Sequence, residues 1–255
     1  MNPAEYDRMA ALEETHWWYA GVRDLFSRLL KRPRFSPPDR PRVLDAGCGS
    51  GAHLQMFQSL LNPSYLGGFD LSPLAVGHAR QKNPQADVYE GDLCHPEIRT
   101  PDLDLLFCCD VLYTTPLDEG TAGLKTLTRT LRPGGLLLLH LPAYNWLRSR
   151  HDLAVHTRQR FTTSSARKLL ELLDLRVELL SYRMSVLFPA LVARRAPSLL
   201  FRRHEDSGDV VSDLAATPPL MNRVLESALK AENRIISCGI PLPFGSSIVA
   251  VGRKP

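Results

Sequence analysis

A glycine-rich turn headed by a carboxylate is the part of this chain best suited to do chemistry. Three glycines at alternate positions follow the acid in the run Asp45-Ala46-Gly47-Cys48-Gly49-Ser50-Gly51. Because glycine has no side chain, a ligand approaches the main chain closely there. The helix expected next directs free N–H groups and a partial positive charge at the turn. These residues predict a site for a nucleotide-type ligand.

Two further carboxylates stand where predicted strands end. Asp70 ends a strand predicted over residues 65–70, and its two oxygens suit the two vicinal hydroxyls of a ribose. Asp92 follows a strand predicted over 86–90, where it would accept a hydrogen bond from an adenine amino group beside Leu93. Ligands of open α/β sheets bind beyond the carboxyl ends of the strands. We therefore expect these acids and the glycine turn to hold one ligand together.

Two nucleotide-binding patterns fit the glycine turn. Gly47, Gly49 and Ala52 match Gly-x-Gly-x-x-(Gly/Ala), which is typical of dinucleotide-dependent oxidoreductases. The same glycines, with Asp45 before them and Gly51 after them, match Asp-x-Gly-x-Gly-x-Gly. The second pattern resembles the first motif of the class I S-adenosylmethionine-dependent methyltransferases.

The downstream sequence favours the second pattern. A Gly-Asp-Leu step at 91–93, a strand over 103–109 that ends at Asp110, and an Arg-Pro-Gly-Gly turn at 132–135 follow in that family's order. Over roughly residues 40–142 the chain resembles this methyltransferase family. The resemblance implies S-adenosyl-L-methionine as cofactor, S-adenosyl-L-homocysteine as product, and methyl transfer as the activity. It implies cofactor contacts at Asp45, Gly47, Gly49, Gly51, Asp70, Leu71, Asp92, Leu93 and the main-chain carbonyl of Cys109.

The N-terminus adds to the resemblance. The run Glu13-Glu14-Thr15-His16-Trp17-Trp18-Tyr19, followed by Arg23, resembles the N-terminal helix of one bacterial branch, where that helix covers the cofactor as a lid. Neighbouring helical residues point about 100° apart, so we expect one tryptophan to pack inward. We expect Trp17 and Tyr19 to border the cofactor, where a sulfonium on an aromatic face gains roughly 0.5–2 kcal/mol. Arg23 is expected to bind either the methionine carboxylate or a surface acid.

Four side chains around the end of the fifth core strand are candidate catalytic residues: His140, Tyr144, His151 and His156. The first ends the strand, and the others lie in a basic, aromatic loop over residues 143–161. Loops at this edge of a sheet are where acceptor sites belong. Relatives often carry an acid and a histidine after the fourth strand, and this chain has Tyr113 and Thr114 there. The identity of a general base is therefore left open.

Strands and helices are expected to alternate in an α/β fold: a doubly wound, Rossmann-like, seven-stranded sheet, mostly parallel with an antiparallel last strand. Residues 1–41 are expected to form a lid helix over 3–31 and a linker, and 42–142 the cofactor-binding core. Residues 143–255 are expected to add the acceptor-site loop, a helical cap and the strands that complete the domain. Further helices are predicted over 50–61, 72–82, 117–131, 162–173 and 221–236, and further strands over 136–141, 176–183 and 246–252.

Composition restricts the partners. A net charge of +4 over 255 residues is too small to indicate a nucleic-acid partner. Five scattered cysteines, with no Cys-x-x-Cys pair, favour a reduced, cytoplasmic protein without a metal site or a disulfide framework. The polar N-terminus does not resemble a signal peptide, and no apolar run approaches the ~18–20 residues of a membrane span.

The acceptor is the least determined part of the prediction. We expect a small-molecule or lipid-like acceptor, with oxygen, nitrogen or carbon as the methylated atom. Residues 185–203 are apolar, broken by two prolines and by paired arginines, and are expected to cap the acceptor pocket. Packing against a partner and peripheral membrane contact through this segment are the other interpretations. An NAD(P)-dependent oxidoreductase and a non-catalytic S-adenosylmethionine-binding protein are the alternative functions, and the oligomeric state is open.

Overall fold

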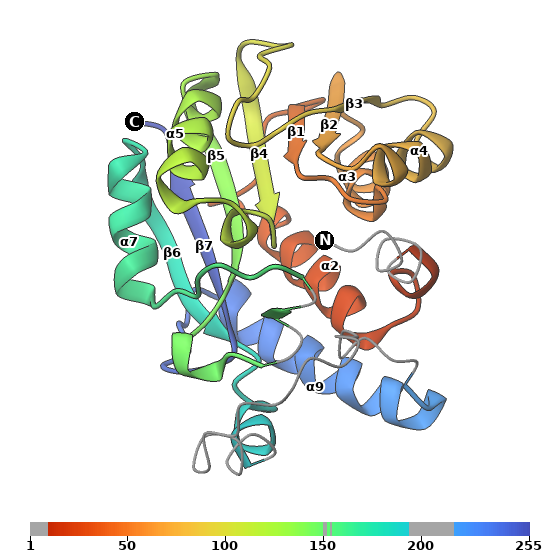
Figure 1. Ribbon diagram of the computed structural model, residues 1–255, viewed down its shortest axis with the longest axis vertical. Helices are drawn as coiled ribbons and strands as arrows, with labels where there is room; N and C mark the ends of the chain where they lie inside the picture. Colours follow the sequence, from red (N-terminus) through yellow and green to blue (C-terminus); the bar gives the residue numbers. More distant parts are fainter. Residues whose placement is uncertain (1–9, 150–151, 154, 194–216) are drawn as a thin grey trace.

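Seven strands form one sheet in the order β3-β2-β1-β4-β5-β7-β6 in the computed structural model of the chain (Figure 1). The structure describes residues 10–149, 152–153, 155–193 and 217–255. Strands β1 to β5 pair in parallel, and β7 lies antiparallel between β5 and β6. The expected doubly wound sheet with an antiparallel last strand is confirmed.

The strands are β1 (Arg42–Ala46), β2 (Tyr65–Asp70), β3 (Asp87–Glu90), β4 (Leu103–Cys109), β5 (Leu131–Pro142), β6 (Arg176–Arg183) and β7 (Ser247–Arg253). The helices that position the site are α2 (Trp17–Leu30), α3 (Ala52–Leu61), α4 (Pro73–Lys82), α5 (Leu117–Thr128), α7 (Thr163–Leu172) and α9 (Pro219–Ser237).

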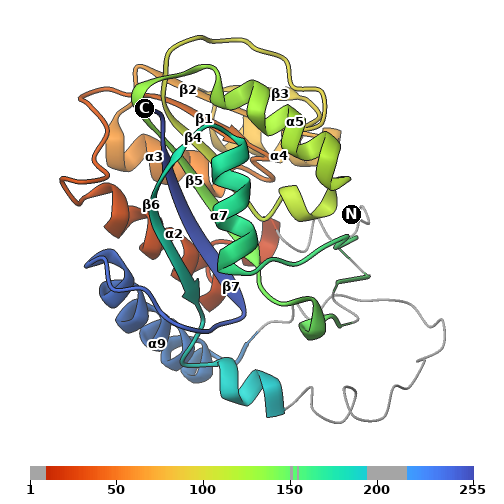
Figure 2. The same cartoon turned by 90° about the vertical axis from the view of Figure 1, so that its left-hand side faces the viewer.

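Helices cover both faces of the sheet (Figure 2). Apolar side chains of α2, α3, α4 and α9 pack on one face around Phe107, and those of α5 and α7 pack on the other around Leu106. Successive residues of a strand point to opposite faces, so neighbouring β4 residues serve two cores. Burial on both faces explains why the strands read as continuous apolar runs.

The strand order reverses between β1 and β4, which lie side by side although β2 and β3 separate them in sequence. The chain leaves β1 toward one half of the sheet and leaves β4 toward the other. A crevice at the carboxyl ends of such strands is where open α/β folds bind ligands. Asp45 in β1 and Asp70 in β2 therefore lie at the edge that the sequence predicted.

Three differences from the expected elements have local causes. The helix expected over 3–31 is interrupted by a turn at 13–15, and α2 begins after His16, whose extended backbone and ring Nδ1 cap the helix by accepting the Trp18 N–H at 3.3 Å. Helix α5 ends at Thr128 rather than at 131. Because proline lacks the N–H that a helix interior requires, the Arg-Pro-Gly-Gly run instead forms the irregular start of β5, which extends from 131 to 142.

Part of the predicted acceptor region lies outside the described residues. That is true of His151 and of residues 194–203 of the predicted cap. No helix in the described ranges is both long enough and apolar enough to cross a bilayer.

Candidate active site

The glycine turn is open on its ligand side and packed on its inner side. A Cβ atom at Gly49, whose φ is +53°, would meet no atom within 4 Å. A Cβ atom at Gly47, whose φ is +84°, would stand 2.2 Å from Cγ2 of Val111 in the loop after β4. The turn thus needs glycine at residue 47 to pack against that loop, while the main chain at residue 49 stays accessible.

Asp70 is held at the sheet edge by two main-chain donors. Its Oδ2 accepts the Gly49 N–H at 2.9 Å and its Oδ1 accepts the Ser72 N–H at 3.0 Å. Burial raises the pKa of Asp70, and these backbone hydrogen bonds partly oppose that shift. Each oxygen keeps a second lone pair, so the carboxylate is oriented by the fold and still able to accept from two hydroxyls.

Asp45 is fully buried, and neither of its oxygens has a hydrogen-bond partner among the described residues. Burial, and then the negative charge of Asp70, raise the pKa of Asp45 well above its ordinary value of 3.8. A buried carboxylate without a partner destabilises the protein. A cationic or hydrogen-bond-donating ligand beside the glycine turn would satisfy it. This unpartnered acid fits a ligand with ammonium, sulfonium and hydroxyl groups.

The third acid extends the site toward β3. Asp92 accepts the Cys94 N–H through Oδ1 at 2.9 Å, and the side chain of Leu93 is buried beside it. Leu71, directly after Asp70, leaves 71% of its surface exposed. An exposed apolar side chain and a partly used carboxylate, on neighbouring strand ends, offer contacts for a planar, amino-bearing ring.

The N-terminal segment covers the glycine turn. The Glu13 carboxylate accepts from the Ser50 hydroxyl and pairs with Lys82 at the end of α4. Arg23 ties the same segment to α2 through the carbonyl oxygens of Glu13 and Glu14. These contacts place the segment across the turn, where the resemblance implied a lid.

The predicted aromatic residues of the lid divide between two environments. The ring of Trp18 packs edge-on against those of Tyr19 and His140, with centroids 4.9 and 5.9 Å apart. Trp17 is half-buried, its ring centroid lies 5.3 Å from that of His16, and its main-chain N–H donates to Oδ1 of Asn222 in α9. Trp18 is thus the tryptophan that packs against the core.

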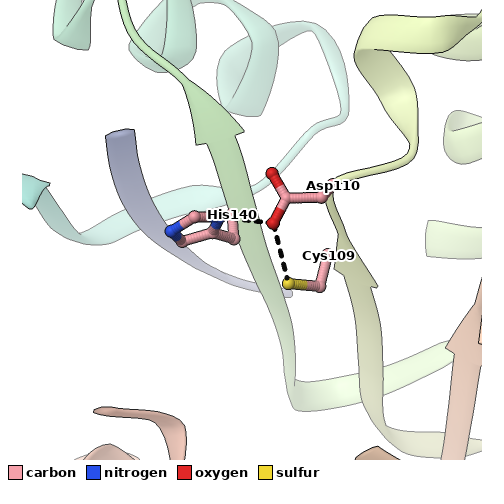
Figure 3. A group of neighbouring side chains, drawn as sticks. All are labelled: Cys109, Asp110 and His140. Carbon is pink, nitrogen blue, oxygen red and sulfur yellow. Dashed lines mark hydrogen bonds and ion pairs between the residues drawn. The ribbon is translucent and has the colours of Figure 1, made fainter. Parts of the chain in front are cut away.

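The ends of β4 and β5 bring three polar side chains together (Figure 3). His140 Nδ1 lies 2.7 Å from Oδ2 of Asp110, and the Cys109 thiol donates to the same oxygen at 3.4 Å. On its other side, His140 Nε2 lies 3.4 Å from a terminal nitrogen of Arg183 at the end of β6. The histidine is fully buried, and both ring nitrogens are occupied.

Two of the other predicted catalytic residues, Tyr144 and His156, are described by the structure and lie outside this group. Tyr144 stacks on Tyr182 and Trp146 in an aromatic cluster, with ring centroids 5.0 and 5.5 Å apart. Burial, followed by the hydrogen bond with Tyr182, raises the pKa of Tyr144. His156 is exposed. Of the three candidates that the structure describes, only His140 joins the polar group at the strand ends, and the catalytic roles of all four stay predictions.

Three side chains that the sequence did not single out as site residues belong to this region. Asp110 and Arg183 are strand-end residues, a position that had already directed attention to Asp70. His53 lies in the first turn of α3 with its ring 4.8 Å from Phe107. Burial, and then the charge of Arg23, lower the pKa of His53 to about 3, so it is a neutral imidazole at physiological pH. The position of His53 two residues after the glycine turn is the feature of the sequence that places it at the site.

Comparisons with known proteins agree with this geometry. Residues 43–135 match the family described as "Methyltransferase domain". The trans-aconitate 2-methyltransferase of Methylobacterium nodulans is 33% identical over 116 residues, which are 45% of this chain and 42% of that protein. The malonyl-[acyl-carrier protein] O-methyltransferase of Serratia marcescens is 29% identical over 147 residues, or 58% and 52% of the two chains.

A third relative carries a different kind of acceptor in its name. The dTDP-4-amino-2,3,4,6-tetradeoxy-D-glucose N,N-dimethyltransferase of Saccharopolyspora spinosa is 26% identical over 103 residues, or 40% of this chain and 41% of that protein. The chain thus spans about half the length, or less, of these relatives.

The fold has matches along its whole length. The TehB-like S-adenosylmethionine-dependent methyltransferase of Corynebacterium glutamicum superposes with a TM-score of 0.58 and 18% identity, covering 100% of both chains. At that identity the match shows the fold. The family match over residues 43–135 covers the glycine turn and strands β1 to β4 of that fold. S-adenosylmethionine is the cofactor of this domain class, and residues 43–135 carry an S-adenosylmethionine-dependent methyltransferase domain.

Proposed function

We propose that the protein transfers a methyl group from S-adenosylmethionine to a small-molecule or lipid-like acceptor. The observation that carries this proposal is the buried, unpartnered carboxylate of Asp45 beside an open glycine turn and the anchored carboxylate of Asp70. Three acids on neighbouring strand ends suit a ligand that combines a sugar, a purine and a cationic chain.

Each cofactor residue has a distinct task in this proposal. Asp70 would accept from the ribose hydroxyls, and Asp92 with Leu93 and Leu71 would border the adenine. Asp45 would face the positively charged methionine part, and Gly49 would admit the ligand to the main chain. The bound cofactor supplies an electrophilic methyl group, so the protein's tasks are to orient the acceptor and exclude water.

The relatives do not agree on an acceptor. Their names specify trans-aconitate, a malonyl group on an acyl-carrier protein, and a dTDP-linked amino sugar. A small-molecule acceptor is therefore the common element that supports our proposal. The lipid-like acceptor, a membrane contact through residues 185–203 and a cytoplasmic location stay predictions from the sequence.

Calorimetric titration with S-adenosylhomocysteine tests the cofactor site directly. We expect binding to the wild-type chain and no binding of NADH or NADPH. Asp70→Ala should weaken binding by at least ~1–3 kcal/mol, or roughly 5–150-fold, the scale of a lost hydrogen bond to a charged group. Asp39→Ala, at an exposed position in the linker before β1, is the matched control and should leave the affinity unchanged. Equal affinities for the wild type and Asp70→Ala would contradict the ribose role.

A further inference from the structure

Two partners on opposite sides fix the ring of His140. An ionised carboxylate only accepts hydrogen bonds, so the 2.7 Å contact with Asp110 assigns the ring proton to Nδ1. A guanidinium only donates, so the 3.4 Å contact with Arg183 assigns Nε2 as an acceptor. The imidazole is therefore a neutral bridge between a cation and an anion, with no nitrogen left to take a proton from a substrate.

Arg183 lies in an enclosure built by elements that are far apart in the sequence. It is fully buried, and its Nε donates to Oδ1 of Asn233 in α9 at 3.4 Å. A Cβ atom at Gly21 in α2 would stand 2.8 Å from its second terminal nitrogen and 2.6 Å from a methyl carbon of Leu229. Helices α2 and α9 thus close over the guanidinium and keep it from reaching an acceptor.

The charge of this arginine has no direct counterion. None of its nitrogens lies within 4.0 Å of a carboxylate in the described residues, and its second terminal nitrogen has no hydrogen-bond partner there. Burial lowers the pKa of Arg183, while the charges of Glu232 and Asp110 oppose that shift. The electrostatic attraction to Asp110 passes through the ring of His140. A buried guanidinium without a direct counterion destabilises the fold. This cost indicates that Arg183 serves to orient the ring of His140 and, through it, the carboxylate of Asp110.

Asp110 has one carboxylate oxygen that the contacts with His140 and Cys109 leave unused. Its Oδ2 is used by His140 and Cys109, while Oδ1 points away from both and has no hydrogen bond within the described part of the chain (Figure 3). The side chain is 20% exposed. The next residue, Val111, packs on the glycine turn, so Asp110 borders the place where the cofactor's reactive end would lie.

The same three side chains do not favour a metal ion. Their ligand atoms lie within 4.8 Å of one another, a spacing that a cation accepts. A metal on Nδ1 of His140 would require that nitrogen to be unprotonated, and the ring proton would move to Nε2. The proton would then face the donating guanidinium of Arg183, which opposes such an arrangement.

The unused oxygen of Asp110 favours some chemical classes of methyl acceptor over others. An acidic acceptor would bring a second negative charge against Asp110, and the guanidinium that would offset it is covered. A hydroxyl must lose a proton as it attacks, and both nitrogens of the His140 imidazole, the side chain most often used for that step, are already occupied. A neutral amine already has a nucleophilic lone pair, and an N–H donated to Oδ1 would direct that lone pair away from Asp110 and place the carboxylate to take the proton released as the N–C bond forms.

We propose that the methyl acceptor is an amine whose N–H donates to Oδ1 of Asp110, and that Arg183 is a positioning residue that holds Asp110 through His140. This inference rests on the proposed methyl transfer. The nitrogen lone pair forms the bond to the methyl carbon while the methyl–sulfur bond breaks and its electron pair stays on sulfur. The excess proton on nitrogen passes to Asp110 and then to solvent.

The acceptor class is tested by transfer of labelled methyl groups. Protein shown by calorimetry to bind S-adenosylhomocysteine is incubated with S-adenosyl-[methyl-¹⁴C]methionine and with methylamine, ethanolamine or glucosamine, and in parallel with acetate or malonate. We expect label in at least one amine and in neither acid. Label in an acid, or in none of the five compounds, overturns the amine assignment. Failure to bind S-adenosylhomocysteine would instead overturn the proposed function.

The role of Asp110 is tested with Asp110→Asn on the amine that is methylated. Asparagine tolerates the φ of 58° at this position, so the backbone should persist. We expect kcat to fall at least about 100-fold, the lower range for a positioned proton acceptor, with cofactor affinity within about twofold of wild type. Asp39→Asn is the control and should keep the wild-type kcat. An unchanged kcat, or a loss confined to cofactor affinity, would contradict the assignment.

The bridge has a spectroscopic signature. In ¹⁵N-histidine-labelled protein, His140 should show a protonated Nδ1 and an unprotonated, hydrogen-bonded Nε2. Arg183→Lys should retain this pattern with a partial loss of kcat, and Arg183→Met should shift Nε2 toward the value of an unbonded nitrogen. Arg167→Met, at an exposed position on α7, should change neither. A proton on Nε2 in the wild type would exclude the bridge even if Arg183→Met fails to fold.

Discussion

The unpartnered carboxylate of Asp45 makes a prediction in which stability and binding move in opposite directions. Asp45→Asn removes a buried negative charge without changing the side chain's size. A buried polar group without a partner destabilises a protein by about 1–3 kcal/mol, and more when it is charged. We expect the ligand-free variant to gain about 1–2 kcal/mol, or roughly 2–8 °C in melting temperature for a chain of this length.

Cofactor binding should show the reverse. If Asp45 faces the cationic part of the cofactor, its replacement removes a hydrogen bond to a charged group, worth about 1.5–3 kcal/mol. Affinity for S-adenosylmethionine should fall roughly 10–150-fold in calorimetry. Adding cofactor should therefore raise the melting temperature of the wild type more than that of Asp45→Asn.

The pH dependence follows from the raised pKa of Asp45. At a pH below its ordinary value of 3.8 the carboxyl is protonated in both folded and unfolded chains, and the two proteins should be equally stable. The advantage of Asp45→Asn should grow as the pH rises from there to the folded-state pKa and stay constant above it. Melting curves of both chains between about pH 4 and pH 8 measure this, with Asp39→Asn as control. A variant that melts lower than wild type at neutral pH and binds cofactor equally well would refute the reasoning.

Three further changes test neighbouring contacts. Asp152→Asn should destabilise the protein by about 3–5 kcal/mol at neutral pH in denaturant titrations, because it leaves the Arg160 guanidinium unpaired. Burial raises the pKa of Asp152, but the hydrogen bonds from Arg160 outweigh it and lower that pKa below its ordinary value of 3.8. The ion pair therefore stabilises the wild type above pH 3.8, and this stability is lost as the pH falls through the folded-state pKa. The difference in stability between wild type and Asp152→Asn should disappear there. Gly49→Ala should cost only about 1–2 kcal/mol of stability, since no atom stands near its Cβ, yet reduce S-adenosylhomocysteine affinity at least about tenfold by calorimetry. Glu13→Gln should weaken the ion pair with Lys82 and speed proteolytic cleavage before residue 17, and an unchanged cleavage rate would contradict the contact across the glycine turn.

The part of the site that local sequence signals specify was predictable. Strands β2, β4 and β6 occupy the residues expected for them, because apolar runs bounded by turn residues define a buried parallel strand. An acid at the end of such a strand must lie at the ligand edge, which is how Asp45 and Asp70 were found. The positions of these acids depend only on the residues next to them in the sequence.

Arg183 shows what the sequence could not provide. An arginine at the end of an edge strand is expected to be exposed, since arginine is seldom fully buried. Its burial depends on the absence of a side chain at Gly21 and on the amide of Asn233, which also donates to the Gly21 carbonyl at 2.8 Å. Three elements from opposite ends of the chain must pack together before this arginine loses its solvent, and no local pattern contains that information.

The backbone conformation at the ligand edge also depends on contacts between distant residues. Three residues within two positions of a strand end have positive φ values, in a region that favours glycine. They are Asp110 at 58°, Tyr144 at 57° and Met184 at 63°. Each is held by a tertiary hydrogen bond from its own N–H: to the His140 carbonyl at 3.1 Å, to the Phe161 carbonyl at 2.8 Å, and to the Glu232 carboxylate at 2.5 Å. Strain of order 1–3 kcal/mol per residue persists only where surrounding contacts impose it, and such residues cluster at functional sites. The three neighbouring loops that would surround an acceptor are therefore shaped by contacts across the fold.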